Sequence, residues 1–331
     1  MIDLARLQRI HLTKRPFGQK FVAWALLAPN YNALPGVKIR VEGFENLPDT
    51  PLIFAMNHTD RYNYWPFQYR LYRVKNRFTA TWVKGKYYEH AFTGWFMEQT
   101  NNIPAVSRGY LITKDFTLTL GRRPTNEEYT ALRTMATPGS AEVAPHLLET
   151  IPRTLFEQPR DILGRRFHPE RETYPESIEA LYRVMMQRFA QINAEAIAKG
   201  LDLIVFPQGT RSARLSRGHI GLAQIALHHR KTVVPVGCSG SDRAYPGVSP
   251  LAQKGEITYR VGKPIPYDEF SDYHIHEPFE PFTLDAETRH RERFQGAVDL
   301  IMDRINLLVD PDYRYSDGQE SHGVSGSDRF L

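Results

Sequence analysis

A histidine and a glutamine each follow a short apolar run, and they are the first candidates for chemistry. His58 comes two residues after the run 51–56, and Gln208 comes two residues after the run 201–206. In open α/β sheets, ligands bind beyond the carboxyl ends of the strands. A neutral imidazole can accept a proton near physiological pH, so His58 could act as an acid–base group. By itself, however, His58 is better explained as a histidine that is merely hydrogen-bonded at the end of a strand.

Four blocks of the sequence resemble, in the same order, those of the glycerol-phosphate and lysophosphatidate acyltransferases. Asn57-His-Thr-Asp-Arg-Tyr-Asn63 resembles the family's His-x-x-x-x-Asp block, and Phe206-Pro-Gln-Gly-Thr-Arg-Ser212 resembles its Phe-Pro-Glu-Gly-Thr-Arg-Ser block. Ile103-Pro-Ala-Val-Ser-Arg108 stands where the family has Gly-x-Ile-x-x-x-Arg, and Val234-Pro-Val236 stands where it has an apolar strand containing proline. The resemblance covers roughly residues 38–265, and four ordered blocks make coincidence a poor explanation.

The resemblance implies that an acyl group passes from acyl-coenzyme A or acyl carrier protein to an alcohol. The acceptor would carry a hydroxyl on a glycerol-phosphate or lysophospholipid-like molecule, in phospholipid biosynthesis. His58 would be the general base that removes the hydroxyl proton. Guanidinium groups match phosphate oxygens, so the arginines of the blocks would hold the acceptor. The substrate-binding residues would be Arg108, Gln208, Gly209, Thr210 and Arg211. No cofactor is implied, because the acyl thioester is itself a substrate.

Two positions depart from the family pattern. Asn63 stands where the family has aspartate, and Gln208 stands where it has glutamate, so each amide keeps the shape and loses the charge. In a serine-protease triad, the same change from Asp to Asn lowers turnover roughly ten-thousandfold. Three outcomes are open: Asp60 supplies the missing carboxylate, Asn63 itself orients His58 through its carbonyl, or the chain is a catalytically degenerate member that binds acyl lipids.

A mostly parallel sheet is expected to position these residues. Short apolar runs predict strands at 51–56, 201–206, 232–236 and 257–261, and 3/4 spacing predicts helices at 178–199, 220–229 and 286–309. Ser177 is expected to cap the first of these helices and Gly200 to end it. Strands that alternate with helices predict an α/β fold with a mostly parallel or mixed sheet and helices on both faces.

The chain is expected to form one large domain with additions. The predicted parts are an amphipathic helical segment at 1–37, the acyltransferase-like domain at 38–265 with an insertion at 110–177, a helical extension at 266–310 and a flexible tail at 311–331. The insertion is predicted to fold over the site as a lid for a bulky acyl chain or acceptor.

Charge is distributed unevenly along the chain. Residues 1–110 carry 15 Lys/Arg against 7 Asp/Glu, whereas residues 267–331 carry 6 against 15. A basic field suits anionic lipid, nucleic acid or a phosphorylated substrate, or it is simply a solvated face. We expect an anionic membrane surface as partner and no nucleic acid. Phe21 and Trp24 lie in an amphipathic stretch that could rest in a membrane interface or cover the core, and removing residues 1–34 is expected to release the protein from membranes.

No targeting or metal-binding segment is expected. The sequence contains no run near the roughly 18 apolar residues of a membrane span and no signal peptide, which predicts a cytoplasmic protein at the inner face of a membrane. The single cysteine, Cys238, follows an apolar run and is expected to be a buried hydrophobe. His274 and His276 are spaced as on a strand but have no second group of ligands nearby.

Overall fold

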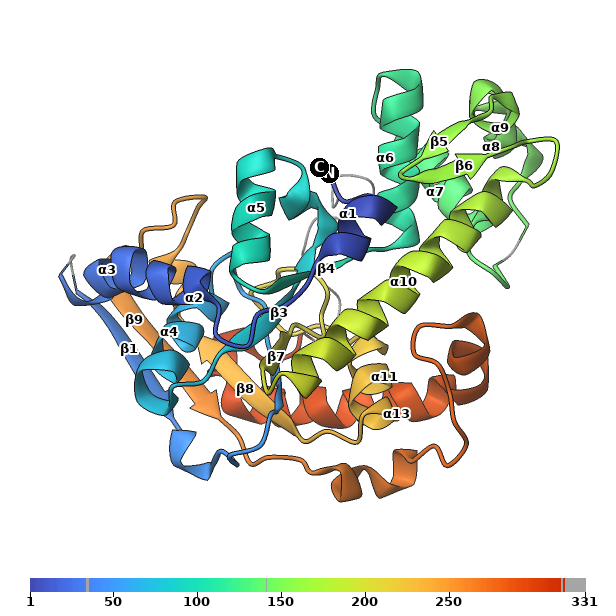
Figure 1. Ribbon diagram of the computed structural model, residues 1–331. Coiled ribbons are helices and arrows are strands. Elements are labelled where there is room, and N and C mark those ends of the chain that lie inside the picture. Colours follow the sequence, from blue (N-terminus) through green and yellow to red (C-terminus); the bar gives the residue numbers. More distant parts are fainter. Residues whose placement is uncertain (34–35, 141, 317, 319–331) are drawn as a thin grey trace.

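A computed structural model describes residues 1–33, 36–140, 142–316 and 318 of the chain (Figure 1). Its centre is a seven-stranded sheet in the order β1-β9-β8-β2-β7-β3-β4. The strands are β1 Val37–Glu42, β2 Ile53–Met56, β3 Thr79–Lys84, β4 Asn102–Ala105, β7 Asp202–Val205, β8 Val233–Ser239 and β9 Gly255–Val261. All neighbours are parallel except β8 and β9, which are antiparallel. The predicted mostly parallel, mixed sheet is confirmed.

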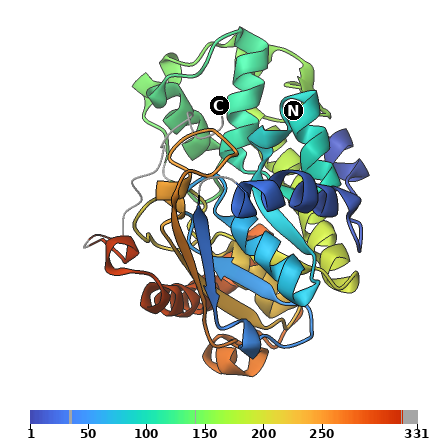
Figure 2. The same ribbon diagram turned by 90° about the vertical axis from the view of Figure 1, so that its left-hand side faces the viewer.

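Helices cover both faces of this sheet, also as predicted (Figures 1 and 2). Successive residues of β2 point to opposite faces, as the period of a strand requires. Ile53 and Ala55 face a core formed with α6, α10, α11 and α13, whereas Phe54 and Met56 face a core formed with α4 and the N-terminal helices. The helices of the first face are α6 Arg108–Leu120, α10 Tyr174–Ala198, α11 Gly221–His228 and α13 Leu284–Leu308. On the second face lies α4 Tyr64–Lys75.

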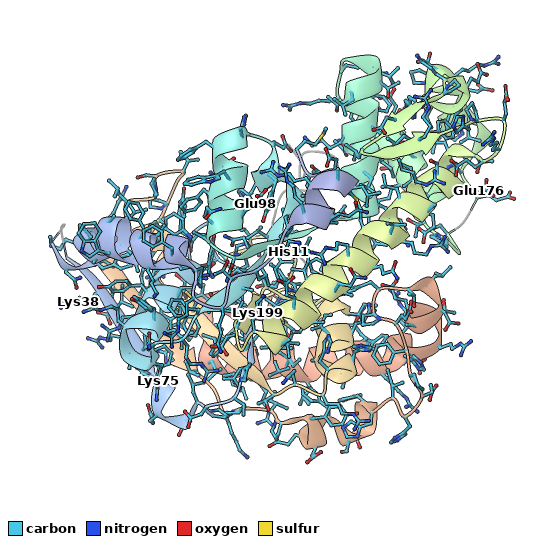
Figure 3. The ribbon with its side chains drawn as sticks, viewed as in Figure 1. His11, Lys38, Lys75, Glu98, Glu176 and Lys199 are labelled. Carbon is cyan, nitrogen blue, oxygen red and sulfur yellow. The ribbon has the colours of Figure 1, made fainter. Side chains whose placement is uncertain are left out.

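The longest predicted helix begins earlier than expected. Thr173 caps α10 in a reciprocal capping box with Glu176, which lies at the upper end of the helix in Figure 3. The predicted cap, Ser177, lies inside the helix, where its buried hydroxyl accepts a hydrogen bond from Arg165 at 2.8 Å. Gly200 follows the last turn with a φ of +77°, a left-handed conformation that ends the helix as predicted.

The N-terminal segment is helical but divided between the two cores. Its elements are α1 Leu4–Arg9, α2 Phe17–Val22, a π-helical turn at Ala23–Leu27 and α3 Ala28–Asn32. Ile2 and Leu7 are buried in the core on the α10 side, whereas Leu27 and Tyr31 pack on the α4 side. Within the described residues, no helix combines the length and the apolar character needed to cross a membrane.

The segment 110–177 packs around the far end of α10, at the upper right in Figure 1. It contains most of α6, then α7 Asn126–Met135, α8 Pro145–Glu149, α9 Thr154–Glu157 and the hairpin of β5 Arg160–Ile162 and β6 Arg165–Phe167. Its buried Phe116, Leu132 and Phe167 join the same core as α10. The segment therefore extends the main core instead of forming a core of its own.

The described chain stays packed beyond α13. A short 3-10 helix, Pro311–Tyr313, places Tyr313 in the interior, where its hydroxyl donates to Asp242 at 2.6 Å. Of the tail predicted at 311–331, residues 317 and 319–331 lie outside the described residues.

Candidate active site

A pocket of about 670 Å³ opens at the carboxyl ends of β2, β3, β4 and β7. His58 follows β2, Lys84 ends β3, Ala105 ends β4 and Phe206 follows β7, and all four line the pocket. The opposite wall comes from α4, from the 3-10 helix Gly85–Tyr88 and from α5 Ala91–Gln99. The site thus lies at the edge of the sheet where ligands of open α/β folds bind.

Asn63 holds the imidazole of His58 in one orientation. The Nδ2 of Asn63 donates to the carbonyl oxygen of Asn57 at 2.7 Å, which turns Oδ1 toward Nδ1 of His58 at 3.2 Å. Because an amide oxygen can only accept, Nδ1 carries the hydrogen and Nε2 keeps its lone pair. The ring also stacks on Phe206, with ring centroids 4.1 Å apart. The hydrogen bond and the stacking therefore fix the ring of His58 and leave Nε2 available as a base.

The pKa of His58 is lowered to about 3. The largest cause is burial against its neighbours, which disfavours the charged imidazolium. The hydrogen bond that His58 donates to Asn63 acts in the opposite direction, and the positive charges of Arg211 and Lys84 lower the pKa further. The imidazole is consequently neutral at physiological pH, and its protonated form lacks a charged partner.

Asp60 does not take the place of the missing aspartate. Its Oδ1 accepts from the backbone N–H of Tyr62 at 2.8 Å, and its Oδ2 accepts from the hydroxyl of Thr59 at 2.9 Å. The carboxylate thus stabilises the turn between His58 and α4 and does not contact the imidazole. The prediction that Asp60 orients the imidazole is therefore wrong.

Gln208 is buried and links two loops instead of facing a ligand. Its Oε1 accepts from the backbone N–H of His58 at 3.0 Å, while its Nε2 donates to the carbonyl of Arg214 at 3.3 Å and to the hydroxyl of Ser216 at 3.4 Å. The backbone N–H of Ser212 donates to the His58 carbonyl at 2.8 Å, which adds a second link. The predicted substrate contact of Gln208 is corrected to a role in holding the His58 turn.

The remaining predicted residues divide between the pocket and its surroundings. Gly209 and Arg211 line the pocket, and Thr210 between them is buried. Gly209 has a φ of +65°, and a Cβ there would come within 2.7 Å of the His219 ring. This turn therefore requires glycine.

Arg108 lies outside the pocket. It stands at the start of α6, where its guanidinium makes two hydrogen bonds of 2.6 and 3.1 Å to Glu179 and lies over the Tyr182 ring at 4.0 Å. Both partners belong to α10. Because its donors are turned to this ion pair, the prediction that Arg108 grips a phosphate in the site is wrong.

Three cations of the pocket were missed by sequence reasoning. Arg61, Lys84 and Lys86 line it together with Arg211, and no Asp or Glu of the described chain does so. Burial and the positive charges of the nearby Arg211 and Arg61 lower the pKa of Lys86. The Nε of Arg61 is buried and has no hydrogen-bond partner among the described residues. The only signal in the sequence was the basic character of residues 1–110.

The predicted lid is not part of the pocket either. No described residue of 110–177 contributes to the wall. The outer wall comes instead from Leu26 of the N-terminal segment, from α5 and from Pro250. These segments, not the insertion, limit access to His58.

Comparison with known proteins gives one sequence match. A 1-acyl-sn-glycerol-3-phosphate acyltransferase from Cocos nucifera is 30% identical over 92 residues, which make up 27% of this chain and 30% of that protein. This match supports the predicted resemblance to the glycerolipid acyltransferases over the 92 aligned residues. The match spans less than a third of the length of this relative. No family model matches the chain.

Among solved structures, the 1-acyl-sn-glycerophosphate acyltransferase PlsC from Thermotoga maritima aligns with 91% of this chain and 80% of that chain, with 15% sequence identity and a TM-score of 0.40.

The four acyltransferase-like blocks differ in how they contribute to the pocket around His58. The first and third blocks are joined by the bonds of Gln208 and Ser212, and both contribute to the pocket. The fourth block lies in β8, which pairs directly with β2 and so supports the strand that ends before His58. The second block reaches the pocket through Ala105, but its arginine turns away to α10.

Proposed function

We propose that the chain is an O-acyltransferase that moves a fatty acyl group from an acyl thioester to a hydroxyl of a glycerol-phosphate or lysophospholipid-like acceptor. The observation that carries this proposal is the composition of one pocket. A neutral, oriented imidazole lies there beside four cationic side chains and a wall of aromatic rings. The sequence likeness to a 1-acyl-sn-glycerol-3-phosphate acyltransferase supports the same chemistry.

The reaction uses His58 as a general base. Its Nε2 takes the proton of the acceptor hydroxyl as the oxygen attacks the thioester carbonyl. The carbon–oxygen bond forms, the carbon–sulfur bond breaks, and the imidazolium returns its proton to the departing thiolate. The hydrogen bond from Nδ1 to Asn63 keeps the ring in place during both transfers.

The cations suit the phosphate groups of the substrates. Arg61 and Arg211 offer planar forks of donors, and Lys84 and Lys86 add point charges in the same pocket. A phosphorylated acceptor and the phosphate of a coenzyme A or carrier-protein arm are both anions that this group would attract. With no carboxylate in the described wall, nothing opposes their approach.

The aromatic wall suits the acyl chain. Trp65, Trp82, Phe92, Phe96 and Met97 also line the pocket. Burial of each methylene of an acyl chain contributes about 0.8 kcal/mol. The chain would thus extend away from His58 toward α5, and its reactive carbonyl would remain beside the imidazole.

Lysophospholipid acceptors and the acylated products are lipids, so we propose that the reaction takes place at the inner face of a membrane in the cytoplasm. The proposal includes no nucleic-acid partner and no metal or cofactor.

A second candidate is a protein that binds acyl lipids without turning them over. It is favoured by the amide at Asn63, which leaves the imidazolium without a charged partner. The full chain should be given acyl-coenzyme A, acyl carrier protein and a panel of lysolipid and glycerol-phosphate acceptors, and thiol release should be measured. Turnover above that of His58→Ala supports the acyltransferase. Saturable binding of the thioester with release equal to His58→Ala would favour the binding protein.

A further inference from the structure

A small hollow lies beside the active-site pocket and shares a wall with it. The hollow has a volume of about 30 Å³, and three aromatic side chains, Tyr64, Trp65 and Phe96, line both the hollow and the pocket. Space of this size holds on the order of two water-sized groups. No step of the proposed acyl transfer involves this space.

The hollow continues the line of the pocket along α4 and α5. On α5, Phe92 and Phe96 line the pocket, whereas Phe96 and Thr100 line the hollow, so the two spaces follow residues that are four apart on one side of the helix. Thr100 lies about 12 Å along this helix from Phe92. On α4, Trp65 lines both spaces, and Tyr72, about two turns further on, lines only the hollow. A long acyl chain in the pocket would therefore point its end toward the hollow.

Two amide side chains of the hollow have their donors engaged. The Nε2 of Gln19 donates to the carbonyl oxygens of Thr79 and Thr100 at 2.7 and 2.8 Å. Because carbonyl oxygens can only accept, this amide has one orientation, and its Oε1 receives only a long hydrogen bond of 3.4 Å from the Thr79 N–H. The Nε2 of Gln68 donates to the hydroxyls of Thr79 and Thr81. Neither amide nitrogen is left for a ligand.

Asn102 supplies a buried acceptor that lacks a donor. Its Nδ2 donates to the Thr100 hydroxyl at 2.7 Å and to the Met97 carbonyl oxygen at 3.3 Å, which fixes the orientation of the amide. The Thr100 hydroxyl donates in turn to the Phe96 carbonyl oxygen at 2.7 Å. The Oδ1 of Asn102 is buried and has no hydrogen-bond partner among the described residues. Since native proteins rarely leave such an atom unpaired, this acceptor indicates a group that comes from outside the chain.

The chemistry of the hollow selects a group that donates a hydrogen bond. A carbonyl, an ether or a carboxylate cannot donate, so none of them would satisfy Oδ1 of Asn102. An ammonium group could donate, but burial of its charge without a counter-charge is costly, and no Asp or Glu of the described chain lines the hollow. A hydroxyl group donates without carrying a charge, and it is the group that fits.

We propose that the preferred acyl group carries a hydroxyl at the far end of its chain, and that this hydroxyl donates to Oδ1 of Asn102. Room for roughly two non-hydrogen atoms matches a terminal CH₂–OH and no larger group. Phe96, whose ring centroid lies 6.4 Å from that of Trp65, is only partly buried and would turn aside to admit the chain end. The proposal deepens the proposed acyl transfer and rests on it for the thioester, but it predicts binding that can be measured without any turnover.

The test measures binding of acyl-coenzyme A to the full wild-type chain by titration calorimetry, without an acceptor. Unsubstituted, ω-hydroxy and ω-methoxy acyl groups are compared at each even chain length from dodecanoyl to octadecanoyl. At the length that reaches the hollow, the ω-hydroxy thioester should bind at least about fivefold more tightly than the unsubstituted one. The ω-methoxy thioester should not show this gain, because an ether cannot donate.

Two contrary outcomes have different meanings. Equal affinity of the ω-hydroxy and unsubstituted thioesters at every length would leave the hollow to ordered water and would overturn this proposal alone. Absence of saturable binding for all the thioesters would overturn the proposed acyl transfer together with it.

A pair of variants assigns the preference to Asn102. Asn102→Leu removes the acceptor and should bind ω-hydroxy and unsubstituted thioesters equally well. The matched control is Thr113→Val, which removes another buried oxygen that has no partner among the described residues, on α6 and outside both spaces. It should keep the wild-type preference. A preference retained in folded Asn102→Leu would overturn the proposal, and if this variant does not fold, the comparison of ω-hydroxy with ω-methoxy thioesters on the wild type decides.

Discussion

At the scale of single residues, Asn63 separates two functions that an aspartate would combine. Its Oδ1 fixes the orientation of His58 through Nδ1, as a carboxylate would. A neutral amide cannot stabilise the imidazolium that forms when Nε2 takes a proton. If the chain is the proposed acyltransferase, the orientation of its base is kept while the charge that would stabilise the imidazolium is missing, so we expect slow turnover.

The contrast between Asn63 and Asp60 is directly testable. Asn63→Ala removes the acceptor for Nδ1 and should lower thiol release by at least about tenfold, because the ring then loses its orientation. Asp60→Asn is the matched control: its amide oxygen can still accept from the Tyr62 N–H, away from the imidazole. Turnover should therefore stay near that of the wild type. Loss of activity in Asp60→Asn with activity kept in Asn63→Ala would contradict the assignment.

The lowered pKa of His58 predicts an unusual pH profile. A general base works only when it is unprotonated, so kcat/KM falls as the pH drops through its pKa. With a pKa of about 3, wild-type kcat/KM should not decline as the pH falls through 6.5, the ordinary value for histidine. Asn63→Asp puts a negative charge beside the ring, raises the pKa and should move the acid limb to higher pH. An acid limb near 6.5 in the wild type would show that burial does not hold the imidazole neutral.

At the scale of elements, the sequence predicted β2, β7, β8 and β9 and missed β1, β3 and β4. β2, β7 and β8 are buried along their whole length, so their apolar runs identify them. β3 alternates threonine with apolar residues and ends in Lys84, and β4 has only four residues. Because two walls of the pocket follow β3 and β4, Lys84 and Lys86 could not be placed at the site from the pattern alone.

Contacts between elements determine which of the predicted residues face the pocket. Arg108 and Gln208 stand in motifs that suggest binding, yet each is turned by a partner distant in sequence, Glu179 for the first and the His58 turn for the second. Contacts distant in sequence also affect the prediction made for the N-terminal segment. Ile2 and Leu7 are fully buried, so removing residues 1–34 would damage the core and could not by itself report on membrane attachment.

The link between the two loops predicts the effect of restoring a family carboxylate. Gln208→Glu would place a carboxylate against the Arg214 carbonyl oxygen, where the amide now donates. A buried group that cannot donate costs about 1–3 kcal/mol, so the free energy of unfolding in urea should fall by that amount. Gln187→Glu, on the exposed face of α10, should leave it nearly unchanged. Equal stability of both variants would show that the Nε2 bonds do not hold the loops together.

At the scale of the whole molecule, the basic part of the chain lies on the same side as the pocket entrance. The basic N-terminal segment contributes Leu26 to the pocket wall, whereas α13, which belongs to the acidic part of the chain, lies in the lower half of the molecule in Figure 1. A molecule with this asymmetry would approach an anionic membrane with its pocket entrance first. The same basic surface would thus both orient the protein on the membrane and bring the pocket entrance to a lipid substrate.

This coupling predicts that the position of a charge matters more than the net charge. Lys14→Glu/Arg15→Glu and Arg291→Glu/Arg304→Glu change the net charge equally, but the first pair is exposed between α1 and α2 and the second is exposed on α13. Each cation near an anionic surface contributes about 1 kcal/mol, so the first variant should bind vesicles that contain phosphatidylglycerol at least about tenfold more weakly. The α13 variant should bind much as the wild type does, and added salt should weaken both the wild type and the α13 variant, because the remaining attraction is screened. Equal losses in the two variants would mean that the protein senses the membrane through its overall charge, and the oriented approach would then have to be abandoned.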